Sequence, residues 1–135
     1  MAQRNPRVAV IGAGMSGICA AAKLQAAGVE DVVIYEKADR VGGTWRENTY
    51  PGLSCDVASR YYCFTFAPNP DWTHVYSPGE EIRAYLESVV DDLGLRAKIR
   101  FGCEVEEAVW SDSGVWRLRT VAGEEGEYDL SLIHI

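Results

Sequence analysis

Two short apolar runs near the N-terminus flank a segment with helical character. Residues 7–11 and 31–36 are rich in valine and isoleucine, which is typical of buried strands. The alanine-rich residues 15–27 between them predict a helix, and Gly28 is suited to end it. The order strand, helix, strand predicts a βαβ unit with two parallel strands.

A second helix is predicted from Ser77 to Gly94. Ser77 and Glu80 have the spacing of a capping box, Pro78 suits the first turn, and Gly94 suits the C-terminal cap. We interpret the apolar stripe along this helix as a packing face. The residues of the stripe are Ile82, Tyr85, Leu86, Val89, Val90 and Leu93.

The C-terminal third of the chain alternates between β-rich runs and turns. Residues 99–110, 115–121 and 127–133 are predicted as strands, separated by the turn-rich segments 111–114 and 123–126. A small antiparallel meander therefore follows the second helix. The predicted fold class is α/β, with a Rossmann-like βαβ unit and a parallel sheet plus this meander.

Between residues 44 and 76 the periodicity is lost, yet aromatic side chains are frequent. Long irregular segments in compact domains are usually functional or disordered, and so many aromatics argue against disorder. One interpretation is a loop that packs under its own side chains. The other is a wall for a flat aromatic cofactor and an organic substrate. The aromatics are Trp45, Tyr50, Tyr61, Tyr62, Phe64, Phe66, Trp72 and Tyr76.

Composition and charge exclude some classes of binding partner. The 135 residues suffice for one domain, and 13 basic against 20 acidic side chains give a formal net charge of −7. No basic cluster stands out, which argues against nucleic-acid or anionic-membrane partners. Because neither a signal-peptide region nor an apolar run of membrane-spanning length is found, we expect a cytoplasmic protein.

The four cysteines lie at irregular spacings without a CxxC pair. This pattern argues against a zinc site and against the adjacent cysteines of a disulfide reductase. We therefore expect reduced thiols and no metal ligands. The cysteines are Cys19, Cys55, Cys63 and Cys103.

A glycine-rich turn joins the first strand to the first helix. Gly12 permits the tight turn, Gly14 lets the backbone approach a phosphate, and Gly17 lets helix and strand pack closely. Glu36 ends the second strand 19 residues after Gly17, close to where a carboxylate accepts hydrogen bonds from a ribose. Since a carboxylate repels a 2′-phosphate, the turn predicts FAD or NAD rather than NADP. The alternative is an ordinary βαβ turn without a ligand.

Further small residues extend this glycine fingerprint. The positions of Ala21, Gly28, Glu36 and the pair Gly42-Gly43 resemble the extended motif of flavoproteins with two dinucleotide-binding domains. In that group the first such unit binds the ADP half of FAD. The resemblance therefore favours FAD over NAD, and the fold would be an incomplete form of that type.

Four segments of the irregular region carry a closer resemblance. They are GGTW at 42–45, YPGLSCDV at 50–57, FTF at 64–66 and NPDW at 69–72. Together they resemble the N-terminal region of Baeyer–Villiger monooxygenases, which belong with the flavin-containing monooxygenases among the class B flavoprotein monooxygenases. The resemblance runs from about Val8 to Asp129, and residues 58–60 depart from the family pattern.

The resemblance implies roles for individual residues. The glycine turn would hold the pyrophosphate of FAD, Glu36 the adenosine ribose, and the backbone of Val105 the adenine. The GGTW segment and Tyr62 would lie beside the flavin, and residues 54–56 would face both flavin and nicotinamide. The expected cofactor-binding residues are Gly12, Gly14, Ser16, Gly17, Glu36, Gly43, Thr44, Trp45, Ser54, Cys55, Asp56, Tyr62 and Val105.

Asp56 is the expected catalytic residue. In the family reaction NADPH reduces FAD, O₂ adds to give the C4a-peroxyflavin, and this peroxide inserts oxygen next to a ketone carbonyl to give an ester or lactone. The resemblance implies that Asp56 orients the arginine whose charge stabilises the peroxide. The partners would be a small organic ketone, O₂ and NADPH. Judged from the residues alone, Asp56 is a solvated loop acid.

The resembled family is several times longer than this chain. Its second, NADPH-binding glycine turn, its histidine-containing fingerprint and its catalytic arginine lie beyond Ile135. We therefore expect the N-terminal portion of an FAD-binding domain at 1–129 and a truncated or non-native tail at 130–135, whose alternation could form a short strand. Alternatives are an N- or S-oxygenating flavin-containing monooxygenase, or a stand-alone dinucleotide-binding module without catalysis.

The small number of parallel strands bears on whether the isolated chain can fold. Only two full parallel strands, 8–11 and 32–36, are expected beside a short third one. Parallel sheets normally need both faces and their neighbouring strands covered. We therefore expect Val10, Val33 and Ile34 to be partly exposed, and the isolated chain to be loosely folded and inactive.

Overall fold

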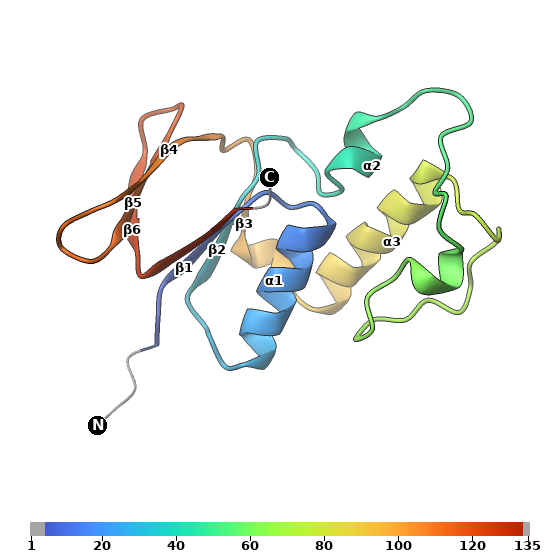
Figure 1. The fold of residues 1–135 in the computed structure, drawn as a ribbon, viewed down its shortest axis with the longest axis horizontal. Helices are drawn as coiled ribbons and strands as arrows, with labels where there is room; N and C mark the ends of the chain where they lie inside the picture. Colours follow the sequence, from blue (N-terminus) through green and yellow to red (C-terminus); the bar gives the residue numbers. More distant parts are fainter. Residues whose placement is uncertain (1–4, 134–135) are drawn as a thin grey trace.

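Two sheets and two main helices make up the fold (Figure 1). The computed structural model describes residues 5–133. A parallel sheet has the strand order β3-β2-β1-β7, and an antiparallel sheet has the order β4-β5-β6, which confirms the predicted α/β class with an antiparallel meander. The elements are β1 (Val8–Ile11), α1 (Met15–Ala26), β2 (Val32–Tyr35), α2 (Thr44–Glu47), η1 (Ser59–Tyr61), α3 (Gly79–Asp92), η2 (Leu95–Lys98), β3 (Ile99–Arg100), β4 (Val105–Trp110), β5 (Trp116–Thr120), β6 (Glu125–Tyr128) and β7 (Leu130–Ile133).

The parallel sheet lies between the helices and the antiparallel sheet. Figure 1 shows α1 and α3 on one side of it and β4–β6 on the other. Successive residues of a strand point to opposite faces. Val8 and Val10 accordingly pack in the core with the helices, while Ala9 packs with Leu118 and Tyr128 of the antiparallel sheet. The short apolar runs are thus covered on both faces, as a parallel sheet requires.

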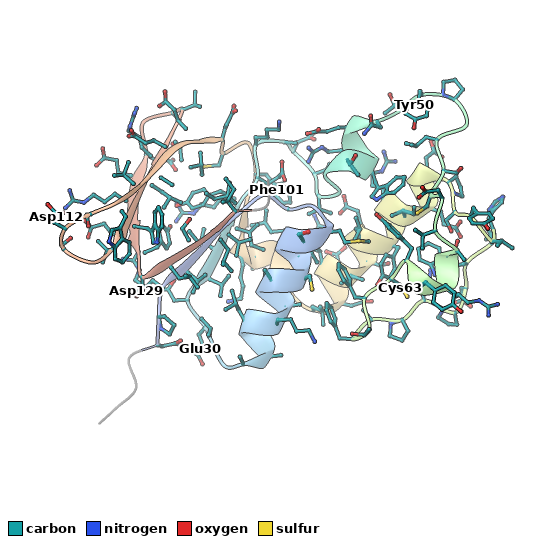
Figure 2. All side chains as sticks on the ribbon, viewed as in Figure 1. Glu30, Tyr50, Cys63, Phe101, Asp112 and Asp129 are labelled. Atoms are coloured by element: carbon teal, nitrogen blue, oxygen red, sulfur yellow. The ribbon has the colours of Figure 1, made fainter. Side chains whose placement is uncertain are left out.

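Two predicted strands are each divided between the two sheets. Of residues 99–110, only Ile99 and Arg100 join the parallel sheet, and a turn at Gly102, with φ +62°, leads into β4. Residues 127–133 divide at Asp129, which Figure 2 labels where β6 ends and β7 begins. The backbone of Arg7 fixes this point, because its carbonyl accepts the N–H of Asp129 and its own N–H donates to the Asp129 carboxylate.

These divisions correct the expected exposure of the sheet. Val10 is 2% exposed and Ile34 is fully buried, so the expectation of partial exposure is wrong for both, whereas Val33 is half-buried as expected. The reason is that β3 extends the sheet beside β2, and β7 pairs with β1 along its whole length. Residues 134–135 of the expected tail lie outside the described residues. The division of the chain at 129/130 into domain and tail stays a prediction.

The long helix α3 is confirmed, but its predicted capping box is wrong. Its apolar stripe is buried except for the half-buried Leu93, and Gly94 has φ +65° at its C-terminal end. Ser77 does not cap the helix: its hydroxyl is buried against that of Ser59, 2.5 Å away. The Glu81 carboxylate instead accepts the backbone N–H of Thr73, which holds the pKa of Glu81 below its ordinary value. The helix start thus anchors the preceding loop.

A buried hydrogen bond joins the two sheets. The hydroxyls of Tyr35 in β2 and Tyr128 in β6 lie 2.6 Å apart, and their rings meet edge to face. Burial, followed by the hydrogen bond to Tyr128, raises the pKa of Tyr35 well above its ordinary value near 10.

We expect this pair to make stability fall at high pH. Unfolded Tyr35 ionises near pH 10 while the folded residue stays neutral, so its contribution is complete below pH 10 and is lost as the pH rises further, by up to about 1.4 kcal/mol per pH unit. Urea unfolding at pH 8, 10.5 and 11.5 measures this loss. Tyr35→Phe should reduce the decline, whereas Tyr61→Phe, at an exposed position, should leave it unchanged. Equal declines in all three proteins would contradict the assignment.

Candidate functional site

A cavity of about 570 Å³ opens at the carboxyl ends of β1 and β2. The carboxyl ends of the strands of an open parallel sheet are where ligands of α/β proteins bind. The cavity is lined by the glycine turn before α1, the end of β2, helix α2, Tyr62 and residues 103–105. Segments that are far apart in the sequence therefore meet around one space large enough for a nucleotide-sized ligand.

The glycine turn has the geometry that its sequence predicts. Gly12 has φ +99°, in the region that favours glycine. A Cβ on Gly17 would lie 1.9 Å from the carbonyl oxygen of Gly12, so only glycine fits where α1 crosses β1. Gly14 is the N-cap residue of α1, and no side chain among residues 5–133 caps this helix. The first N–H groups of α1 therefore remain available to an anion in the cavity.

The pair Gly42-Gly43 packs directly on this turn. The N–H of Gly42 donates to the carbonyl of Ala13, and a Cβ on Gly43 would lie 3.0 Å from the Cα of Gly14. Both glycines have positive φ, +126° and +52°. Helix α2 starts immediately afterwards at Thr44. The contact between the two glycine motifs thus places α2 at the rim of the glycine turn.

Glu36 lies at the end of β2 with its carboxylate 4% exposed. Its Oε2 accepts the N–H of Ala13 at 2.8 Å, and its Oε1 accepts the N–H of Ala38 at 2.9 Å. The guanidinium of Arg46 lies 3.1 Å from Oε1. No role for Arg46 was expected from the sequence. The only local signal is a basic residue directly after the GGTW segment.

The aromatic segment divides into two groups. Trp45 and Tyr62 line the cavity, and the indole N–H of Trp45 donates to the Tyr62 hydroxyl at 3.1 Å. Phe64, Phe66 and Trp72 instead pack in the helical core around Tyr85. Tyr50, Tyr61 and Tyr76 are exposed, and Figure 2 shows Tyr50 on the loop beyond α2. Both interpretations of this segment therefore hold in part: Trp45 and Tyr62 form a cavity wall, and the phenylalanines and Trp72 pack the loop against the core.

The structure does not bring residues 54–56 to the cavity. Cys55 is buried in the core, and its N–H donates to the carbonyl of Ser77 just before α3. Ser54 pairs with Pro78 in an isolated β-bridge. Asp56 is exposed. The roles expected for these three residues stay predictions.

Ten of the thirteen residues expected to bind the cofactor line the cavity, and their role in binding stays a prediction. They are Gly12, Gly14, Ser16, Gly17, Glu36, Gly43, Thr44, Trp45, Tyr62 and Val105. Sequence reasoning missed several further lining residues, among them Tyr35, Lys37 and Cys103. Burial and then Glu124 raise the pKa of the Cys103 thiol, so it is a protonated wall residue at neutral pH.

The described residues 5–133 contain no group of His, Cys, Asp or Glu side chains placed to hold a metal ion. Within the same range, no helix has the length and apolar character needed to cross a bilayer. The candidate site is the cavity of the glycine turn, whose lining combines polar groups with aromatic rings.

Comparisons with known proteins identify similar sequences. The family model described as an NAD(P)-binding Rossmann-like domain matches residues 10–78. A Baeyer–Villiger monooxygenase from Streptomyces coelicolor is 51% identical over 118 residues, covering 87% of this chain and 23% of the relative. An uncharacterised monooxygenase of Mycobacterium tuberculosis is 57% identical over 129 residues, covering 96% of this chain and 26% of the relative. The chain thus spans about a quarter of the length of these relatives.

The solved structures that resemble this chain are also about four times longer than it. An open crystal structure of cyclohexanone monooxygenase superposes with a TM-score of 0.87 at 38% identity, covering 95% of this chain and 26% of that chain. A steroid monooxygenase bound to NADP gives 0.89 at 38% identity, with 95% and 25% covered. A complex of OTEMO with FAD and NADP gives 0.88 at 27% identity, again with 95% and 25% covered.

Proposed function

This chain belongs to the NAD(P)-binding Rossmann-like domain family and corresponds to the N-terminal portion of Baeyer–Villiger and other FAD-binding monooxygenases, and on this premise we propose that its cavity binds FAD. The observation that carries the proposal is the fixed Glu36 carboxylate beside the open N-terminus of α1 in one cavity. The helix would hold the pyrophosphate, and Glu36 would accept the ribose hydroxyls.

We further propose that the whole protein is an NADPH- and O₂-dependent monooxygenase that inserts oxygen next to a ketone carbonyl. Bound FAD would supply the oxygen chemistry. Within this chain, the glycine turn would bind the cofactor, and Trp45 and Tyr62 would limit the access of water to the flavin. Support comes from the named relatives and from solved cyclohexanone monooxygenases that hold cyclohexanone or ε-caprolactone.

Replacing Glu36 by alanine tests the FAD site. The variant removes a charged acceptor from the ribose, which should lower FAD affinity roughly ten- to a hundredfold, or about 1.5–3 kcal/mol. The measurement is FAD content after dialysis of the full-length protein. Glu104→Ala, which removes the same charge from the same cavity, should retain FAD. Unchanged FAD content in Glu36→Ala would contradict the assignment.

The 135 residues alone should not oxygenate ketones. They span about a quarter of the relatives, and residues 54–56 lie away from the cavity. The measurement is NADPH oxidation together with product analysis, with the full-length protein as a positive control. Ester formation by the isolated chain would contradict this expectation and would place the whole reaction within these residues.

A further inference from the structure

Arg46 is held on the rim of the cavity by three different segments. Its guanidinium side chain is 12% exposed. One nitrogen, Nη1, donates to the carbonyl of Arg40 at 2.8 Å and lies 3.1 Å from Glu36 Oε1. The other, Nη2, donates to Glu47 at 2.8 Å. Arg46 therefore connects the end of β2, the loop before the double glycine, and α2.

The carboxylate of Glu36, which pairs with Arg46, is nearly buried and lies beside the glycine turn. A buried charge is costly unless it is paired and hydrogen-bonded. Two backbone N–H groups satisfy one acceptor position on each oxygen, and each carboxylate oxygen has two. Arg46 contributes the only guanidinium that the described residues place on Glu36. The carboxylate is thus fixed and ion-paired, with one acceptor position on Oε2 left for a ligand.

We propose that Arg46 is a positioning residue for the ribose of the bound dinucleotide. It touches Glu36 rather than the reacting groups, and it holds the carboxylate at the angle from which its remaining acceptor position, on Oε2, meets a ribose hydroxyl. The double glycine makes this possible, because its contact with Ala13 and Gly14 sets where α2, and hence Arg46, begins. This inference rests on the proposed FAD site and deepens it.

The test compares two ligands in the full-length protein after removal of its flavin. They are FAD and the FAD analogue whose adenosine ribose lacks both hydroxyls, and the quenching of flavin fluorescence reports their binding. Arg46→Met should weaken FAD about tenfold but the analogue less than twofold, because Arg46 acts only through the ribose contact. Arg46→Lys keeps a positive charge and should regain most of the loss.

The ratio of the two affinities is measured on one preparation, so partial misfolding of a variant does not change it. Arg96→Met removes an arginine that forms ion pairs far from the cavity, and it should leave the ratio at the wild-type value. Equal weakening of both ligands by Arg46→Met would overturn the inference, because it would show a structural role only. Tighter FAD binding would overturn it as well, by showing that Arg46 occupies the ribose position.

The experiment gives a different result if the proposed FAD site itself is wrong. If the wild-type protein binds FAD and the analogue equally, Glu36 does not contact the ribose, and the proposed FAD placement falls together with the inference. If the wild type and Arg46→Met discriminate equally while Glu36→Ala does not discriminate, the placement stands and only the role of Arg46 falls.

Discussion

Gly17→Ala should disrupt the fold more than any other single-methyl addition in the glycine turn. The new Cβ would lie 1.9 Å from the Gly12 oxygen and 3.0 Å from the Gly12 carbonyl carbon, both in backbone that cannot rotate away. Helix α1 must therefore separate from β1. We expect a loss of at least about 3 kcal/mol, since such overpacking lies at the upper end of its usual cost. Thermal unfolding followed by circular dichroism should show a midpoint lowered by roughly 10 °C or more.

Gly14→Ala is the matched control for this experiment. Its Cβ would meet only Gly43, with the Cα at 3.5 Å and the N at 3.9 Å, which are ordinary contacts, and Gly14 has an ordinary φ of −82°. The variant should unfold close to the wild-type temperature while binding FAD more weakly, because its methyl stands where the phosphate approaches the backbone. Equal midpoints for Gly17→Ala and Gly14→Ala would contradict the steric argument.

Asp56→Ala should abolish ketone oxygenation in the full-length protein without releasing FAD. We propose that this carboxylate orients a positive charge, supplied by the remainder of the protein, that stabilises the negative charge of the reacting oxygen. Removing one such electrostatic contact typically costs about a hundred- to a thousandfold in rate. FAD should stay bound because Asp56 lies outside the cavity of the glycine turn. The measurements are ester yield and flavin absorbance of the purified protein.

Asp71→Ala provides the comparison, since Asp71 is another exposed acid in the same irregular segment. It should retain both FAD and activity. A wild-type ester yield in Asp56→Ala would remove the proposed role, and loss of FAD from that variant would show that Asp56 contributes to cofactor binding instead.

The glycine turn and Glu36 could be predicted because their requirements are local. Positive φ at Gly12 and the helix–strand contact at Gly17 are constraints within a dozen residues, and each admits few residue types. The strand that ends in Glu36 follows at a spacing fixed by one helix and two turns. The sequence is therefore sufficient to locate the glycine turn and the carboxylate that line the cavity.

The remaining features depend on partners that are distant in the sequence. Whether Ile99 extends the parallel sheet or begins the meander is decided by pairing with Ile34, which no local pattern records. Ser77 has the correct spacing for a cap, but Ser59 binds its hydroxyl instead. Arg46 meets Glu36 only because the intervening loop folds back. In each case a tertiary contact overrides a local preference.

The pairing of β1 with β7 has a consequence for the order of folding. Val8 lies beside Leu130, so β1 waits for a strand that is synthesised more than 100 residues later. Local contacts allow β1, α1 and β2 to associate early, whereas closing a loop of this length is entropically slow. Until β7 arrives, one edge of β1 presents unpaired backbone groups, and such edges recruit other chains. A nascent chain stalled before Leu130 would therefore be a strong client for chaperones at the ribosome.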